Sequence, residues 1–142
     1  MPLNVIALES SFDLVAPRGD ELVSVFYRRL FERAPQVRPL FAHVDMTRQR
    51  SMLLAALVLL RKSLRNLDPI VPKLRELGAR HVAYGATPDA YPVVGEVLIA
   101  SMAEIAGDDW RGEYTQAWAE AYAVVQAVML EGAESSEQAA AA

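Results

Sequence analysis

The histidine at position 81 has the most specific chemistry in this sequence. If the segment around it is helical, Leu74, Leu77, His81 and Tyr84 follow spacings of three and four and share one apolar face. A histidine on such a face either bonds to the backbone inside a core or binds a metal in a buried cavity, because neutral imidazole is the commonest nitrogen ligand of buried metals. We therefore take His81 as a candidate metal ligand, with a core histidine as the alternative.

A second set of side chains suits the surroundings of a flat metal cofactor. Gln49 and Leu53 lie one helical turn apart, Tyr27 is a hydrogen-bond donor on an earlier helix, and Phe41 is an aromatic residue between them. Iron porphyrin is a flat apolar disc that needs an axial nitrogen on one face, and apolar space with a donor for a bound gas on the other. His81 suits the first face, Tyr27 and Gln49 suit the second, and Phe41 can pack on the ring.

Each of these residues also has a simpler interpretation. Tyr27 and Phe41 are ordinary core or boundary residues if no cofactor is present, and Gln49 is then a solvated glutamine near a helix start. Arg48 takes the place of Gln49 if the preceding loop is longer than we assume. We read His43 as a surface histidine, with contact to a haem propionate or distal iron coordination as alternatives.

Length and composition limit the classes of protein that fit. The 142 residues suit one domain, and the 53% hydrophobic residues can line a pocket as well as fill a core. The net charge of −4 argues against nucleic-acid binding, which needs a basic surface. The absence of cysteine excludes disulfides, iron–sulfur clusters, thiolate metal sites and a cysteine nucleophile. No nucleophile elbow, P-loop or dinucleotide-binding glycine motif is present either.

The sequence also leads us to expect a cytoplasmic protein. Its first residues lack the basic and apolar segments of a secretory signal. The longest strongly apolar run, residues 51–60, is too short to span a bilayer and suits a buried helix, so we expect no membrane span.

Helical patterns run through nearly the whole chain, so we expect an all-α fold. In the first half of the chain we predict a helix capped by Asn4 and ending at Pro17, a second from Asp20 to Pro35, a short turn over Pro35–Phe41, and a long helix from about Thr47 to Asn66. In the second half we predict a helix with Pro72 in its first turn, a helix opened by Pro92 and ended by Gly107, and a last helix capped by Asp108 or Asp109. We expect a domain over residues 1–131 and a disordered C-terminal tail over 132–142.

Four segments, in order and with compatible spacings, resemble bacterial single-domain haemoglobins and the haem domain of flavohaemoglobins. Residues 26–31 (FYRRLF) and 34–41 (APQVRPLF) resemble their B helix, C turn and the start of the CD corner. Residues 78–81 (GARH), followed by 91–95 (YPVVG), resemble their proximal histidine and the opening of their G helix, and residues 117–122 (AWAEAY) resemble their H helix. The resemblance covers residues 4–131 and implies a globin fold, a three-over-three helical sandwich enclosing haem b.

The resemblance implies a role for each candidate residue. His81 would be the proximal iron ligand, Tyr27 and Gln49 the distal donors, Leu53 the distal apolar wall, and Phe41 the phenylalanine stacked on the porphyrin. Arg80 is a candidate contact for a haem propionate, with a solvated arginine as the alternative.

Tyr91 matches a tyrosine that, in flavohaemoglobin-like globins, forms a hydrogen-bonded group with the proximal histidine and an H-helix glutamate. Alignment on Trp118 and Tyr122 puts Ala133 where that glutamate falls, and Glu131 and Glu134 lie nearby but out of register. This mismatch argues against the strong proximal effect on the iron that peroxidase-like or dioxygenase chemistry requires.

The function implied is tight, reversible binding of dioxygen at ferrous iron, for oxygen binding, storage or transport. One hydrogen bond to a ligand with negative charge contributes about 1.5–3 kcal/mol, which changes affinity roughly 10- to 100-fold. Nitric oxide dioxygenase activity is a further expectation, and no flavin or nicotinamide domain is readable, so electrons would come from a separate reductase. The alternatives are a haem-based gas sensor and a haem-free globin-fold interaction module, and the oligomeric state stays open.

Overall fold

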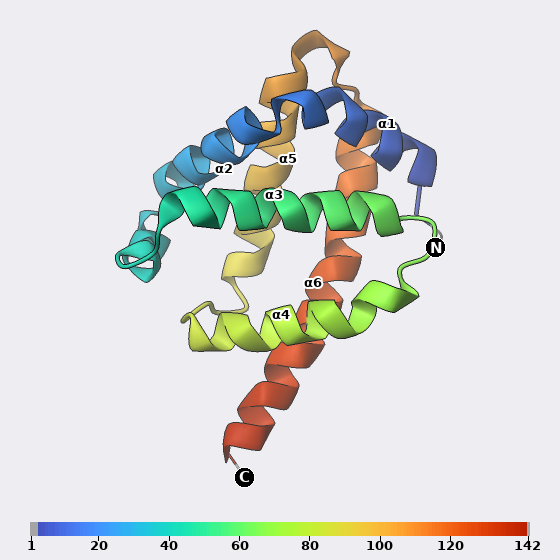
Figure 1. The fold of residues 1–142 in the computed structure, drawn as a ribbon. Coiled ribbons are helices and arrows are strands. Elements are labelled where there is room, and N and C mark those ends of the chain that lie inside the picture. Colours follow the sequence, from blue (N-terminus) through green and yellow to red (C-terminus); the bar gives the residue numbers. More distant parts are fainter. Residues whose placement is uncertain (1–2, 142) are drawn as a thin grey trace.

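The computed structural model describes residues 3–141, and this part of the chain is helical with no strand. Short 3-10 turns connect some of the helices (Figure 1). The α-helices are α1 (Val5–Val15), α2 (Gly19–Arg33), α3 (Met46–Ser63), α4 (Val71–Ala83), α5 (Ala90–Ala106) and α6 (Gly112–Ala141). The predicted all-α class is confirmed.

The helices form two crossing layers. In the view of Figure 1, α3 and α4 lie across α5 and α6. The most extensive helix contact is between α4 and α6, followed by that between α2 and α5, while α1 packs on both α5 and α6. This is the predicted three-over-three sandwich, and it leaves α3 and α4 facing the long helices α5 and α6.

The main core lies between α1, α2, α5 and the first half of α6. Its largest fully buried side chains include Leu8, Leu22, Met102 and Trp118. The buried Ser11 hydroxyl accepts a hydrogen bond from the Trp118 indole N–H at 2.8 Å and donates to the Ala7 carbonyl at 2.6 Å. The polar groups of this core are therefore paired, as burial requires.

Ion pairs fasten α3 to α1 at one end. Glu9 of α1 accepts from Arg61 at 3.2 Å and from Arg65 at 2.7 Å, and Arg61 also bonds to Asp13 at 3.0 Å. Only Leu57 of α3 is buried. The middle of α3 packs on α2, where Leu54 lies against Gly19, so the ion pairs add to this contact at one end of the helix.

The helix α5 is apolar enough to resemble a membrane span. Residues 90–109 meet the length and hydropathy criteria for one. The core helix of a globular protein meets the same criteria, and α5 packs against α1, α2 and α6 with Val97, Leu98, Met102 and Ile105 buried. Its place in the fold is that of a core helix.

Several helix ends agree with the sequence. Asn4 caps α1, where its side chain accepts from the Ala7 N–H at 3.2 Å, and Pro72 lies in the first turn of α4. Gly107 ends α5 with a φ of 60°, a conformation that glycine adopts without strain. Asp45 caps α3, so that this helix starts at Met46, one residue before the predicted start.

Other helix ends differ from the prediction. Asp20 is not the cap of α2 but lies in its first turn, because a 3-10 turn, Ala16–Arg18, leads directly into that helix. The helix α5 begins at Ala90 rather than at Pro92, since proline is tolerated within a first turn, where N–H groups have no helical partner. Asp108 and Asp109 lie in a 3-10 turn that ends before α6 begins at Gly112.

The segment expected to be a disordered tail continues α6 as helix to Ala141, and Ala142 lies outside the described residues. Gly132 and Ala133 are buried, and Gly132 approaches the backbone of α4 at Arg75. This contact joins elements that are distant in sequence, and composition alone does not reveal it. Packing of this kind supports helix where local composition does not predict it.

Candidate functional site

A cavity of about 320 Å³ lies between α3, α4, α5 and α6. This volume is at the lower end of the range for small-molecule sites, roughly 300–1,000 Å³. Its wall is almost wholly apolar and consists of Phe26, Met52, Leu53, Ala56, Leu57, Leu59, Leu60, Ile70, Lys73, Leu74, Leu77, His81, Ala86, Ala90, Tyr91, Val94, Leu98, Trp118, Tyr122, Val125 and Met129. Met52 and Leu59 are respectively 49% and 39% exposed, so α3 lines the cavity and also meets solvent.

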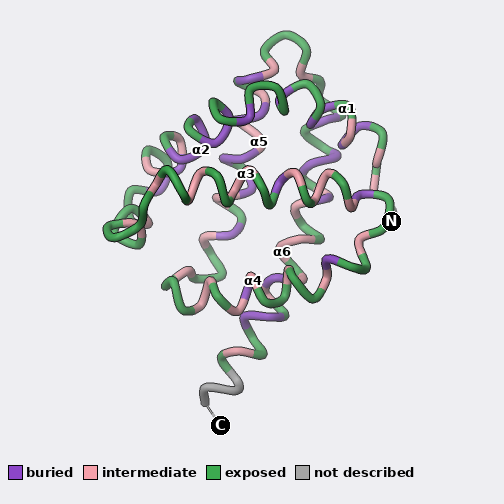
Figure 2. The backbone as a smooth tube through the Cα atoms, in the orientation of Figure 1, coloured by how far each residue is buried: buried purple, intermediate pink, exposed green. Residues whose placement is uncertain are grey.

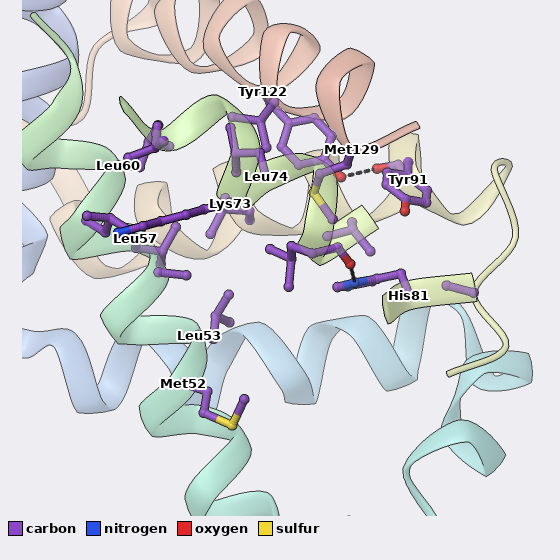
Figure 3. Close-up of a pocket in the computed structure, with 18 of the residues that line it drawn as sticks. Met52, Leu53, Leu57, Leu60, Lys73, Leu74, His81, Tyr91, Tyr122 and Met129 are labelled. Carbon is purple, nitrogen blue, oxygen red and sulfur yellow. Dashed lines mark hydrogen bonds between the residues drawn. The ribbon is translucent and has the colours of Figure 1, made fainter. Parts of the chain in front are cut away.

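The cavity wall includes His81, as its place on the apolar face of α4 predicted. The Nδ1 atom of His81 lies 2.7 Å from the Leu77 carbonyl oxygen (Figure 3). A carbonyl can only accept, so Nδ1 carries the proton and donates it, and in the neutral imidazole Nε2 then has the free lone pair. An imidazole held in this tautomer by a backbone carbonyl is the arrangement that metal-binding histidines usually have.

The donor set fits an iron that arrives within an organic cofactor. Within residues 3–141, no group of three or more His, Cys, Asp or Glu side chains is placed to hold a bare metal ion. A single imidazole nitrogen beside an apolar space suits haem, because the porphyrin supplies the other ligands. The residues present therefore fit a haem group.

Two tyrosines complete the wall near His81. The Tyr122 hydroxyl donates to the main-chain carbonyl of Tyr91 at 2.6 Å, and the Tyr91 ring lies 6.3 Å from the His81 ring (Figure 3). Burial raises the pKa of both hydroxyls, and the proximity of Tyr91 adds to the rise for Tyr122. Both are therefore neutral at physiological pH.

Ala133, which the resemblance predicts at the position of the H-helix glutamate, is buried. The neighbouring carboxylates lie elsewhere, since Glu131 pairs with Arg75 at 3.3 Å and Glu134 is exposed. The proton acceptor of His81 is accordingly the neutral Leu77 carbonyl rather than a carboxylate. A neutral acceptor increases the basicity of the imidazole less than a charged one does.

Tyr27 and Gln49 meet between α2 and α3. The Gln49 side-chain amide donates to the Tyr27 hydroxyl oxygen at 3.0 Å, so the tyrosine keeps its own proton for another acceptor. Burial raises the pKa of Tyr27, while the hydrogen bond from Gln49 and the charge of Arg50 oppose the rise. The structure thus pairs Tyr27 with Gln49, and Arg48 is exposed.

Leu53 and Phe41, the other residues predicted on this side of a cofactor, have different surroundings. Leu53, one turn after Gln49, is part of the cavity wall. Phe41 packs against Tyr27 and Phe31, with ring centroids 5.7 and 5.3 Å apart, and lies outside the wall. Tyr27 and Gln49 also lie outside it, so the polar pair adjoins the apolar cavity at Leu53.

The two peripheral candidates are both exposed. Arg80 forms an ion pair with Glu76 one turn earlier, and this pairing lowers the pKa of the glutamate. Arg80 is not part of the cavity wall, and His43 lies in the segment before α3. A propionate that bound Arg80 would have to compete with Glu76.

Sequence reasoning missed several residues of the wall. Leu57, Lys73, Tyr122 and Met129 all line the cavity, and the sequence indicated no role there for any of them (Figure 3). Apolar residues that line a cavity have the same spacing as residues that fill a core, so no sequence signal separates them.

Comparison with known proteins identifies the family. The globin family profile matches residues 24–129, most of the chain. The chain is a globin. This globin is 31% identical over 130 residues to the flavohemoprotein of Rhizobium meliloti, an alignment that covers 90% of the chain but 32% of the relative. It thus spans about a third of the length of the flavohemoproteins it matches.

Solved structures agree in fold. An engineered carbene transferase, derived from RmaNOD of Rhodothermus marinus, superposes with a TM-score of 0.82 at 26% identity, covering 96% of this globin and 93% of that chain. A bacterial globin from Campylobacter jejuni superposes at 0.79 and 20% identity, covering 92% and 94%. Family membership makes this a haem-binding, gas-binding chain.

Proposed function

We propose that this globin holds haem b through His81 and binds dioxygen tightly and reversibly in the cytoplasm. The observation that carries the proposal is the His81 imidazole, fixed by Leu77 with its Nε2 lone pair free, in the wall of an apolar cavity. When bound, haem supplies an iron centre that binds diatomic gases and exchanges electrons.

The residues of the chain then divide the remaining tasks. The apolar wall, including Leu53, excludes water, which strengthens each electrostatic interaction inside. Tyr27 offers a hydroxyl proton to a ligand with partial negative charge, and Gln49 orients that hydroxyl by donating to its oxygen. A donor of this kind slows ligand release, because a hydrogen bond to a charged group contributes about 1.5–3 kcal/mol.

Nitric oxide detoxification is the enzymatic role we propose in addition, with electrons from a reductase that is fused or separate. Two similarities support it: the relatives named flavohemoproteins, and RmaNOD, which has a provisional assignment as a nitric oxide dioxygenase. Sustained nitric oxide consumption with a matched reductase would support turnover. A single turnover of the oxygenated protein alone would not, since almost any oxygen-binding globin reacts once.

Replacement of His81 tests the cofactor assignment. We expect the wild-type protein to bind one haem with a strong Soret band and to form a stable ferrous–oxygen spectrum, and His81→Ala to lose the cofactor on gel filtration. His43→Ala is the matched control, because it removes the only other histidine at an exposed position. Haem retention and unchanged optical bands in His81→Ala would refute the assignment, and a wild-type protein that refuses haem would favour a haem-free interaction module.

A further inference from the structure

Two glycines face each other's helices where α4 crosses α6. A Cβ added at Gly78 would overlap the backbone carbonyl of Met129, and one added at Gly132 would overlap that of Arg75. In both cases the obstacle is backbone, which cannot turn aside as a flexible side chain can. The contact is therefore reciprocal, and it brings α4 closer to α6 than any other residue type would permit.

This crossing lies beside His81. Gly78 precedes His81 by three residues on α4, and Met129 lines the same cavity as the imidazole. The distance between the two helices therefore determines how far the imidazole extends over the cavity. A close-packed interior transmits such a displacement rather than absorbing it.

Tyr91 provides a reference point that is anchored to α6. Its carbonyl accepts the Tyr122 hydroxyl at 2.6 Å, and Tyr122 belongs to α6. The separation of the His81 and Tyr91 rings, 6.3 Å, thus reports the position of α4 relative to α6. By contrast, Tyr84 follows His81 on the same stretch of chain, 5.6 Å from its ring, and reports only local geometry.

We propose that Gly78 and Gly132 are positioning residues: by fixing the distance between α4 and α6, they set how far the His81 imidazole reaches into the cofactor cavity. The inference rests on the proposed role of His81 as the haem ligand. A methyl group at either glycine forces the helices apart by about 1 Å or more, since carbon contacts closer than roughly 3.5 Å are repulsive. The His81–Leu77 hydrogen bond lies within α4, so it stays intact while the imidazole moves away.

The test compares Gly78→Ala and Gly132→Ala with the wild-type protein, both without and with haem. In the cofactor-free protein, we expect the nuclear Overhauser signal between the His81 and Tyr91 rings to weaken by about twofold or more, because it falls steeply with distance, while the His81–Tyr84 signal is unchanged. In the haem-loaded protein, we expect a lower iron–imidazole stretching frequency. Haem loss should be faster by roughly 10-fold, within the range seen when the support of a metal ligand is removed.

Two controls separate positioning from general destabilisation. Gly112→Ala adds a methyl at a site where nothing lies within 4 Å, and alanine is the stronger helix former, so no readout should change. Val15→Ala removes core packing in α1, away from α4, and should lower stability without moving the stretching frequency. The double glycine variant should change the ring contact and the stretching frequency only slightly more than either single variant does, because both methyls open the same crossing.

Each outcome decides the proposal. Weakened ring contacts together with a shifted vibration in either glycine variant support it. Unchanged ring contacts overturn it, and so does a shifted vibration that Val15→Ala reproduces. If one glycine variant does not fold, the other is sufficient, because the crossing is reciprocal. Failure of the proposed function appears separately, as a wild-type protein without haem affinity.

Discussion

The two sides of the long helices α5 and α6 are built differently. On one side, α1 and α2 form with them a closed core, in which side chains such as Leu8, Leu22 and Met102 are fully buried. The tube in Figure 2 is coloured as buried at many positions of α1 and α2. On the other side, α3 and α4 are mostly exposed or half-buried in Figure 2, with Leu57 and Gly78 as their buried residues. The first side fills its own space, and the second encloses a cavity.

The side that encloses the cavity contributes less packing to the stability of the fold. Apolar side chains that face a cavity lack half of their packing partners. A flat apolar cofactor would supply those partners, and ligand binding to the folded state alone stabilises it by mass action. Without a cofactor in the cavity, the core of α1, α2, α5 and α6 should therefore supply most of the free energy of unfolding.

The largest difference in stability is expected between two leucine-to-alanine substitutions, one in the closed core and one in the cavity wall. In the cofactor-free protein, Leu22→Ala in the core should lower the free energy of unfolding by about 2–5 kcal/mol. Leu60→Ala in the cavity wall should lower it by about 1 kcal/mol or less, since its atoms already face empty space. Urea denaturation measures both, and equal losses would contradict the division into two regions.

The buried hydrogen bond of the core provides a second test. Ser11→Ala leaves the Trp118 indole N–H buried without an acceptor, which should cost about 1–3 kcal/mol of unfolding free energy. Ser24→Ala is the matched control, because its hydroxyl bonds to the Asp20 carbonyl at an exposed position. A loss no larger than that of the control would show that the core tolerates the unpaired group.

Tyr27 belongs to both regions, since it is buried in the core and bonded to Gln49 of α3. Tyr27→Phe should speed dioxygen dissociation at least about tenfold, equivalent to roughly 1.4 kcal/mol. Stopped-flow kinetics of the ferrous protein measures this rate, with the exposed Tyr84→Phe as control. A change below about twofold would remove Tyr27 from the distal role.

The smallest effect concerns pH. Because the folded-state pKa of Tyr122 lies above its usual value of 10.0, the unfolded chain loses this proton first as pH rises. The stability contribution is therefore complete below pH 10 and declines above it. Tyr122→Phe should lose about 0.5–1.5 kcal/mol near neutral pH and show a shallower alkaline decline. Denaturation curves from pH 8 upward check this, and an unchanged slope would count against it.

Local patterns predicted the helices and the faces of the site. The spacing of Leu74, Leu77 and His81 placed the imidazole on an apolar face, and the structure puts all three in the cavity wall. Gln49, preferred to Arg48 from the sequence, is the residue that meets Tyr27, although α3 starts one residue earlier than predicted. These features depend on residues within a few positions of one another, so the sequence reveals them.

Contacts between distant segments were not predictable in the same way. The hydrogen bond from Tyr122 to the Tyr91 carbonyl joins a side chain to a backbone atom, and any residue at position 91 would offer that carbonyl. The small polar composition of residues 132–142 suggested a disordered tail, whereas α6 continues to Ala141 and meets α4 at Gly132. The roles toward a cofactor that the resemblance implies stay predictions for every candidate: Tyr27, Phe41, Gln49, Leu53, Arg80, His81 and Tyr91.

The partly exposed cavity wall of α3 affects how the protein can be produced. Met52 and Leu59 meet both the cavity and solvent, and exposed apolar surface promotes self-association. Chains synthesised faster than porphyrin is supplied would carry this surface uncovered and collect in aggregates. Expression yield should accordingly follow the supply of iron and porphyrin precursor in the growth medium.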